Sequence, residues 1–77
     1  MKRYHYIEIN PNVMFGKPVI KGTRVTVELI LRKLSRGLSP EEIVREHPTI
    51  TVEHIREAQA FAADLLTTEE IYFAKSA

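Results

Sequence analysis

The sequence predicts a mainly α-helical fold, in which an N-terminal β-strand and a short β-hairpin precede a three-helix bundle with a helix-turn-helix. Three observations lead to this prediction. Residues 3–9 alternate and are rich in aromatic and β-branched types, as in a strand. From Val27 onward the apolar positions recur every three or four residues, as on one helical face. Three capping residues, Thr26, Ser39 and Thr51, divide this second part into three helices.

The N-terminal strand is assigned to residues 3–9 (RYHYIEI), and the Asn-Pro-Asn that follows ends it. A strand places alternate side chains on opposite faces. The two faces should therefore carry Tyr4, Tyr6 and Glu8 on one side and His5, Ile7 and Ile9 on the other.

Residues 18–25 (PVIKGTRV) are predicted to form a hairpin, with two short extended pieces on either side of Lys21 and Gly22. Glycine takes the positive φ that such a tight turn needs. The stretch is not a phosphate-binding loop, because that loop places glycine before lysine, and here Lys21 comes first. Pro18 also removes one N–H donor that would hold the anion.

The first helix is predicted to begin after the N-cap Thr26 and to end before Gly37, a residue suited to the left-handed position beyond a helix end. Its basic residues cluster in the last turns, where cations favour the negative end of the helix dipole. Its apolar face consists of Val27, Ile30, Leu31, Leu34 and Leu38.

The second helix is predicted to start in the stretch SPEE, residues 39–42. Ser39 is the expected N-cap, Pro40 suits the first helical position, and Glu42 completes a capping box. This helix should end by His47, since a proline follows and restricts the residue before it.

The third helix is predicted to start at Thr51 and to continue to Leu66. Its narrow stripe, with Phe61 at the margin, allows close packing against the first two helices. The stripe consists of Val52, Ile55, Ala58, Ala62 and Leu65. The tail that follows begins with another capping pattern, from Thr67 to Glu70.

The 77 residues are expected to form one domain, comprising a strand and hairpin (1–25), a helix-turn-helix unit (26–66) and a C-terminal tail (67–77). The absence of cysteine excludes disulfides and cysteine-based zinc sites. Without a long apolar run or a leader-like N-terminus, we expect a soluble cytoplasmic protein with no membrane contact. Association with another subunit is then the remaining way to reinforce so small a core.

Charge is distributed unevenly along the chain, although the net charge is only +1. Residues 1–36 hold eight basic and two acidic side chains, a balance of +6, whereas residues 37–77 hold three basic and eight acidic ones, a balance of −5. This asymmetry fits a polyanion contact through the first half. It fits equally well two oppositely charged parts of one domain, or of two subunits, that face each other.

Candidate DNA-binding residues fall into two groups. The hairpin and first helix contribute Lys17, Lys21, Arg24, Arg32, Lys33 and Arg36. The start of the third helix, which reads bases in helix-turn-helix proteins, contributes Thr51, His54 and Arg56, although that helix is acidic overall. Arg24 has a second expected role, because Glu28 lies four residues further on and is a possible ion-pair partner.

The sequence offers no convincing catalytic or metal site. The three histidines, His5, His47 and His54, show no metal-binding spacing, so no metal is expected. The carboxylate pairs at residues 41–42 and 69–70 stand at helix starts, where they interact with the helix dipole. We therefore expect neither an enzyme nor a cofactor.

The run from Pro11 to Ala62 resembles the domain of unknown function 433 family, whose members share a G-x-P-x-I-x-G-T-R segment, a helix, a G-x-S-x-E-E-I segment, a proline-containing turn and a threonine-started helix. The matching positions are Gly16, Pro18, Ile20, Gly22, Thr23 and Arg24, then Gly37, Ser39, Glu41, Glu42 and Ile43, and finally Pro48, Thr51 and Ile55. Two positions depart from the pattern: His47 stands where tyrosine is frequent, and Ile50 where leucine is usual.

This resemblance implies a homeodomain-like or winged three-helix domain, usually dimeric, that is the small bacterial partner of a PIN-like ribonuclease toxin. In that setting the protein would be the antitoxin of a type II toxin–antitoxin system, binding the toxin, with its own operator DNA as a second partner that the resemblance leaves open. A ribonuclease cleft should be electropositive, so an acidic segment with aromatic anchors suits it. The toxin-binding residues expected on this basis are Glu69, Glu70, Ile71, Tyr72 and Phe73.

Other interpretations remain open at the level of sequence. The apolar tail has an equally good role in packing on its own domain. A stand-alone DNA-binding transcriptional regulator would use the basic first half. A structural dimerisation module would bind neither toxin nor DNA.

Overall fold

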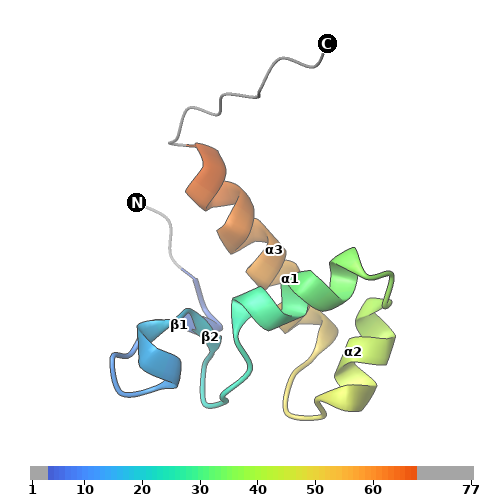
Figure 1. Ribbon diagram of the computed structural model, residues 1–77, viewed down its shortest axis with the longest axis horizontal. Coiled ribbons are helices and arrows are strands. Elements are labelled where there is room, and N and C mark those ends of the chain that lie inside the picture. The colour runs from blue at the N-terminus through green and yellow to red at the C-terminus, as the bar shows by residue number, and fades with distance from the viewer. Residues whose placement is uncertain (1–3, 68–77) are drawn as a thin grey trace.

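The computed structural model describes residues 4–67, in which a small sheet precedes three helices (Figure 1). Strands β1 (Ile7–Glu8) and β2 (Val19–Ile20) are joined through the short 3-10 helix η1 (Met14–Gly16). The helices are α1 (Val27–Ser35), α2 (Pro40–Glu46) and α3 (Val52–Thr67). This arrangement confirms the mainly helical fold with N-terminal strands that the sequence predicts. Helix α3 contacts α1, α2 and β1, and its C-terminal part extends away from the other helices.

Both ends of α1 are formed as predicted. The Thr26 side chain accepts a hydrogen bond from the N–H of Leu29 at 3.0 Å, which satisfies one of the free donors of the first turn. Beyond the other end, Gly37 has a φ of 95° and its N–H donates to the carbonyl of Leu34 at 3.0 Å. The left-handed glycine therefore turns the chain toward α2.

Helix α2 starts with the predicted capping box. The N–H of Glu42 donates to Ser39 Oγ at 3.1 Å, and the N–H of Ser39 donates to Glu42 Oε1 at 2.9 Å. Pro40 occupies the first helical position, where it has no need of a donor. The helix ends at Glu46, two residues before Pro48.

The strand predictions are only partly right. Residues 4–6 are not in the sheet, and β1 is limited to two residues, whose partner in the antiparallel sheet is β2. The expected hairpin keeps its turn, because Gly22 has a φ of 76°, but its second arm reaches β2 only through an isolated bridge between Val19 and Thr26. The second arm leads directly into the cap of α1, which leaves it no length to form a strand.

Because β1 is so short, the burial of side chains in residues 4–9 does not follow the alternation expected for a strand. Ile7 is buried at 7% exposure, whereas Ile9, predicted to share its face, is 60% exposed. Tyr4 packs against the core although the prediction placed it on the strand face opposite Ile7. The period-two rule does not extend beyond the two residues that are in the strand.

An aliphatic core joins the sheet to all three helices. Its largest fully buried side chains are Ile20, Ile30, Ile43, Ile50, Ile55 and Val19. On α3 the predicted stripe is right for Ile55 and Ala58, which are fully buried, but Leu65 is 56% exposed because α3 continues past the end of the core. Within residues 4–67, no helix has the length and apolar character needed to span a membrane.

Candidate binding surface

The start of α3 is held by a reciprocal pair of hydrogen bonds. The N–H of His54 donates to Thr51 Oγ1 at 3.3 Å, and the N–H of Thr51 donates to His54 Nδ1 at 3.1 Å. Histidine thus takes the part that glutamate or glutamine has in a capping box. Two of the three predicted base-reading residues are therefore engaged in forming the helix, while Arg56 is exposed.

One face of α3 is covered by the N-terminal segment. The Glu57 carboxylate accepts hydrogen bonds from the N–H groups of His5 at 3.1 Å and Tyr6 at 2.5 Å. The Tyr6 ring lies with its centroid 4.6 Å from that of His54. The carbonyl of Tyr6 also accepts a hydrogen bond from the N–H of Lys21, just after β2, at 2.7 Å. The end of this segment is therefore fixed both by a carboxylate of α3 and by the backbone beside the sheet.

Tyr4 anchors the same segment one turn or more further along α3. Its ring meets Phe61 edge to face, with centroids 5.1 Å apart and an interplanar angle of 78°. Its hydroxyl donates a hydrogen bond to the Asp64 carboxylate. This bond, together with burial and the negative charge of Asp64, raises the pKa of Tyr4 to about 12.

The four α3 residues under this segment were not predicted as a functional group. They share one helical face, since their spacing is three, four and three residues. A signal was present in the sequence, because acidic and aromatic side chains alternate along that face, at the margin of the apolar stripe. The residues are His54, Glu57, Phe61 and Asp64.

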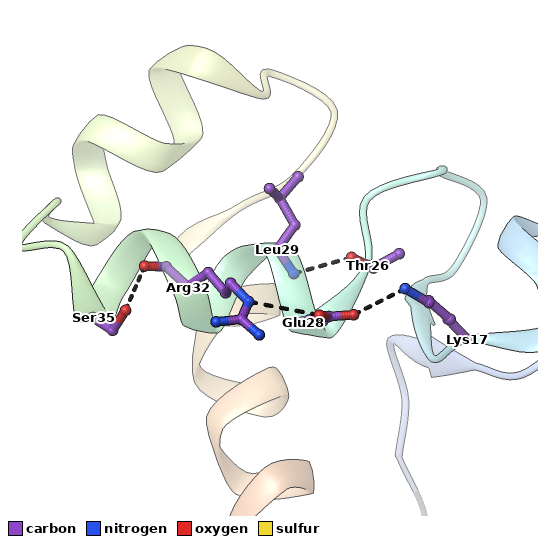
Figure 2. Close-up of polar contacts among 6 residues, drawn as sticks. All are labelled: Lys17, Thr26, Glu28, Leu29, Arg32 and Ser35. Atoms are coloured by element: carbon purple, nitrogen blue, oxygen red, sulfur yellow. Dashed lines mark hydrogen bonds and ion pairs between the residues drawn. The ribbon is translucent and has the colours of Figure 1, made fainter.

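Glu28 neutralises two of the predicted DNA-binding cations (Figure 2). Its carboxylate lies 3.0 Å from Lys17 Nζ and 3.6 Å from Arg32 Nε. The hydrogen bond and charge of Lys17, with the charge of Arg32, hold the pKa of Glu28 below its usual value. Figure 2 shows Glu28 and Arg32 on α1, near the Thr26 cap, with Lys17 reaching Glu28 from the loop before β2.

The predicted ion pair between Arg24 and Glu28 is wrong. Arg24 precedes the Thr26 cap and is not helical, so the four-residue spacing of a helix face does not apply to it. Lys33 is also neutralised, by an ion pair with Glu46 of α2 that links two helices. Within residues 4–67, the three members of the basic cluster that form no ion pair are Lys21, Arg24 and Arg36, all of them exposed.

A polar cleft of about 270 Å³ lies beside the turn that follows β2. Its lining consists of Glu8, Asn12, Val13, Gly22, Thr23 and Arg24. The N–H of Gly22 donates to Glu8 Oε1 at 3.5 Å, which places an acidic group in the cleft next to Arg24. The cleft is therefore mixed in charge rather than selective for anions.

The loop before β2 presents an aromatic side chain that the sequence analysis did not single out. Phe15 is 95% exposed, and its φ of 58° lies in the left-handed region. Met14 before it and Gly16 after it also have positive φ values, of 47° and 79°. No sequence signal marks this conformation, because phenylalanine is rarely found there.

An apolar groove separates α1 from the C-terminal half of α3. Its volume is about 450 Å³, and its apolar walls come from Val27 and Leu31 on α1 and from Phe61 and Leu65 on α3. Pro18 closes one part of it, and Glu28 and Arg32 lie at its polar edge.

The predicted toxin-binding residues Glu69 to Phe73 lie outside the residues that the structure describes. In the described part of the chain, no three histidine, aspartate or glutamate side chains converge in an arrangement that could hold a metal ion.

Three helices preceded by a two-stranded sheet define this protein as a small, mainly helical domain. The chain belongs to the family described as "Protein of unknown function (DUF433)", whose sequence pattern matches residues 7–62. This membership confirms the resemblance carried by the glycine, threonine and arginine motifs.

Similarity to individual proteins agrees with this assignment. "Uncharacterized protein y4eO" of Sinorhizobium fredii (strain NBRC 101917 / NGR234) is 34% identical over 53 residues, a match that covers 69% of this chain and 24% of the relative. The chain thus spans only a minor part of that relative's length. The crystal structure of a DUF433 member protein from Anabaena variabilis ATCC 29413 shares the fold, with a TM-score of 0.73 at 24% identity, over 80% of this chain and 61% of that one.

Proposed function

We propose that this protein is the antitoxin of a type II toxin–antitoxin pair and that it binds and inhibits a PIN-like ribonuclease. The observation that carries the proposal is the net negative charge of α3, where Glu53 is exposed and Glu57 and Asp64 keep their charge while they accept neutral donors of the N-terminal segment, against Arg56 alone. A helix inserted into a DNA groove faces phosphates on both sides, so net negative charge opposes that use. The same charge favours a partner with a basic surface.

A ribonuclease that binds an RNA backbone offers such a surface at its cleft. In the sequence, residues 69–73 follow shortly after α3, and there two glutamates precede an isoleucine and two aromatic residues. The glutamates would meet the basic cleft, and the aromatic side chains would supply buried contact area of the kind that dominates binding energy. The tail is thus the proposed inhibitory segment, and the globular part positions it.

The test begins by recovering the proteins that bind the tagged chain in its native cell and identifying by mass any ribonuclease among them. Its RNA cleavage is measured alone, with the wild-type chain, and with a Tyr72→Ala, Phe73→Ala double variant. We expect wild-type protein to suppress cleavage and the double variant to bind at least tenfold more weakly, as expected for the loss of two aromatic anchors.

A Lys75→Ala, Ser76→Ala double variant is the matched control, because it alters the same tail outside the proposed anchors. It should inhibit as the wild type does. Full inhibition by the Tyr72→Ala, Phe73→Ala variant would refute the role of these two residues as anchors. Failure to recover any ribonuclease would refute the antitoxin proposal itself.

A DNA-binding role, either at the protein's own operator or as a stand-alone regulator, is the second candidate. It is favoured by the exposed cations Lys21, Arg24 and Arg36, which have no acidic partner within residues 4–67. Such binding must weaken steeply as salt rises, because each neutralised phosphate releases counterions. Binding to duplex DNA that is insensitive to salt between 50 and 200 mM, about the range over which phosphate contacts are lost, would exclude this role.

A further inference from the structure

We propose that two copies of this chain associate by placing Phe15 of each copy in the α1–α3 groove of the other. This pairing does not depend on the antitoxin proposal, since it concerns the purified chain alone. The Phe15 side chain is called the knob below, and the groove lined by Val27, Leu31, Phe61 and Leu65 keeps the name α1–α3 groove.

The knob has no function within its own chain. Phe15 is 95% exposed, and no residue of η1 is buried. Yet its backbone is held in the left-handed region, which is unfavourable for a bulky L-residue. Strain of this kind persists where a site requires it, and an exposed aromatic side chain on a fixed loop is a typical anchor for a protein partner.

The α1–α3 groove matches the knob in size and chemistry. Its volume of about 450 Å³ falls in the range of pockets that hold small molecules, about 300–1,000 Å³, so a phenyl ring fits within it. Its walls are mainly aliphatic, and Phe61 adds a ring that an incoming aromatic side chain can meet edge to face. Leu65 stays 56% exposed along this groove, so the apolar surface is not covered by the described part of its own chain.

The position of the two features favours a second copy as the occupant. Pro18, three residues after the knob, lines the groove, and Lys17 is paired with Glu28 at its edge. The loop therefore passes beside the groove while the knob points into solvent. Because the loop that carries the knob borders the groove, a two-fold axis beside that loop would bring both knob–groove pairs together at once, which gives a closed, self-complementary interface.

The charges near the groove are compatible with self-association. Glu28 lies between Lys17 and Arg32, so the edge of the groove is close to neutral. Two copies can approach there without repulsion. Burial of apolar surface between copies would also reinforce a core that is small for a chain of 77 residues.

Sedimentation equilibrium of the full chain tests the interface. We expect wild-type protein to form a dimer, and Phe15→Ala and Leu65→Glu each to raise its dissociation constant at least tenfold. Two matched controls remove or alter comparably exposed side chains outside the interface. These are Ile9→Ala, at 60% exposure, and Leu66→Glu, at 56% exposure and adjacent to Leu65; both should stay within twofold of wild type.

Mixing the two disruptive variants gives a sharper result. The Phe15→Ala chain keeps its groove and the Leu65→Glu chain keeps its knob, so a mixed pair retains one knob in one groove whereas neither variant alone retains any. Native mass spectrometry of the mixture should therefore show heterodimers in excess over both homodimers.

Several outcomes would overturn the proposal. A monomeric wild-type chain excludes it, as does a Phe15→Ala variant that dimerises as tightly as wild type. Weakening by Leu65→Glu but not by Phe15→Ala would mean that another segment, such as the chain's own tail, occupies the groove. Growth into species larger than a dimer would contradict the two-fold arrangement. Because Phe15 is exposed, circular dichroism of its alanine variant should match wild type, so loss of folding cannot imitate the result.

Discussion

Phe15 stands in a backbone conformation that glycine adopts freely and that other L-residues adopt at a cost of about 1–2 kcal/mol. Its side chain makes no compensating contact with the core, since it is 95% exposed. In the isolated chain, phenylalanine at this position therefore lowers the stability of the fold.

Replacing Phe15 by glycine should accordingly stabilise the monomer relative to replacement by alanine. Alanine keeps the left-handed strain, whereas glycine removes it. Glycine also raises the conformational entropy of the unfolded chain, but this offsets only part of the stability gained. We expect Phe15→Gly to unfold with a free energy about 1 kcal/mol larger than Phe15→Ala in urea. At Lys17, where φ is −71°, the glycine variant should instead have a smaller unfolding free energy than the alanine variant. Equal values for the two Phe15 variants would show that the residue is not left-handed.

Tyr4 is the residue whose ionisation reports on the attachment of the N-terminal segment. Its neutral hydroxyl donates to Asp64, so its pKa is raised to about 12 in the folded protein. Because the folded value is the higher one, the bond stabilises the protein fully below pH 10 and loses its effect as pH rises toward 12.

Ultraviolet titration of the phenol groups checks this prediction. We expect one tyrosine of the wild-type chain to ionise late, near pH 12, and Asp64→Asn to bring that step down. A Tyr4→Phe variant should lose the late step altogether. If the late step survives in Tyr4→Phe, another tyrosine is responsible and the contact with Asp64 is wrong.

At the scale of elements, helix ends could be predicted from sequence and strand ends could not. Thr26, Ser39 and Gly37 act on backbone groups within a few residues of themselves, so their roles follow from local rules. The extent of β1 depends on where β2 lies and on how Glu57 of α3 captures the segment before it. Those contacts join distant parts of the chain and leave no short-range pattern.

The capping box of α2 gives this element its own pH dependence. Hydrogen bonds with the N–H and side chain of Ser39 lower the pKa of Glu42. A lowered folded pKa means that the charged carboxylate stabilises the fold above the ordinary value of 4.5, and that this contribution is lost as pH falls through the folded value.

Glu42→Gln should keep the cap at neutral pH, because glutamine also serves in a capping box, but remove this titration. The difference in unfolding free energy between pH 7 and pH 3 should thus be smaller for Glu42→Gln than for wild type, when measured by urea unfolding. Ser39→Ala is the structural comparison and should cost about 1 kcal/mol at neutral pH. An unchanged pH dependence in Glu42→Gln would show that the box is not formed in solution.

At the scale of the whole molecule, the predicted basic cluster is divided by acidic residues from elsewhere in the chain. The sequence identified the cations but not their partners, because Lys33 meets Glu46 across two helices and Lys17 meets Glu28 across a loop. The one partner that was proposed, Glu28 for Arg24, was wrong since only one of the two is helical. Composition along a chain therefore overestimates the charge on its surface.

Glu28→Gln measures how much of the DNA-binding potential this pairing suppresses. Freeing Lys17 and Arg32 should raise affinity for duplex DNA and steepen its salt dependence by up to about two phosphate contacts. Glu41→Gln makes the same change in net charge on α2 and should have a smaller effect. Equal effects of the two variants would mean that net charge, rather than this site, governs binding.

The contact between Tyr4 and Asp64 joins residues 60 positions apart, and so brings the start of the described chain against the last turn of α3. A folded segment whose two ends lie close together tolerates circular permutation and insertion into a host loop. A permuted version of residues 4–67 alone, which opens between the exposed residues Pro11 and Asn12 and joins residue 67 to residue 4 by a short glycine-serine linker, should keep the same core. The packing of the segments, and not the order in which they are connected, would then specify this fold.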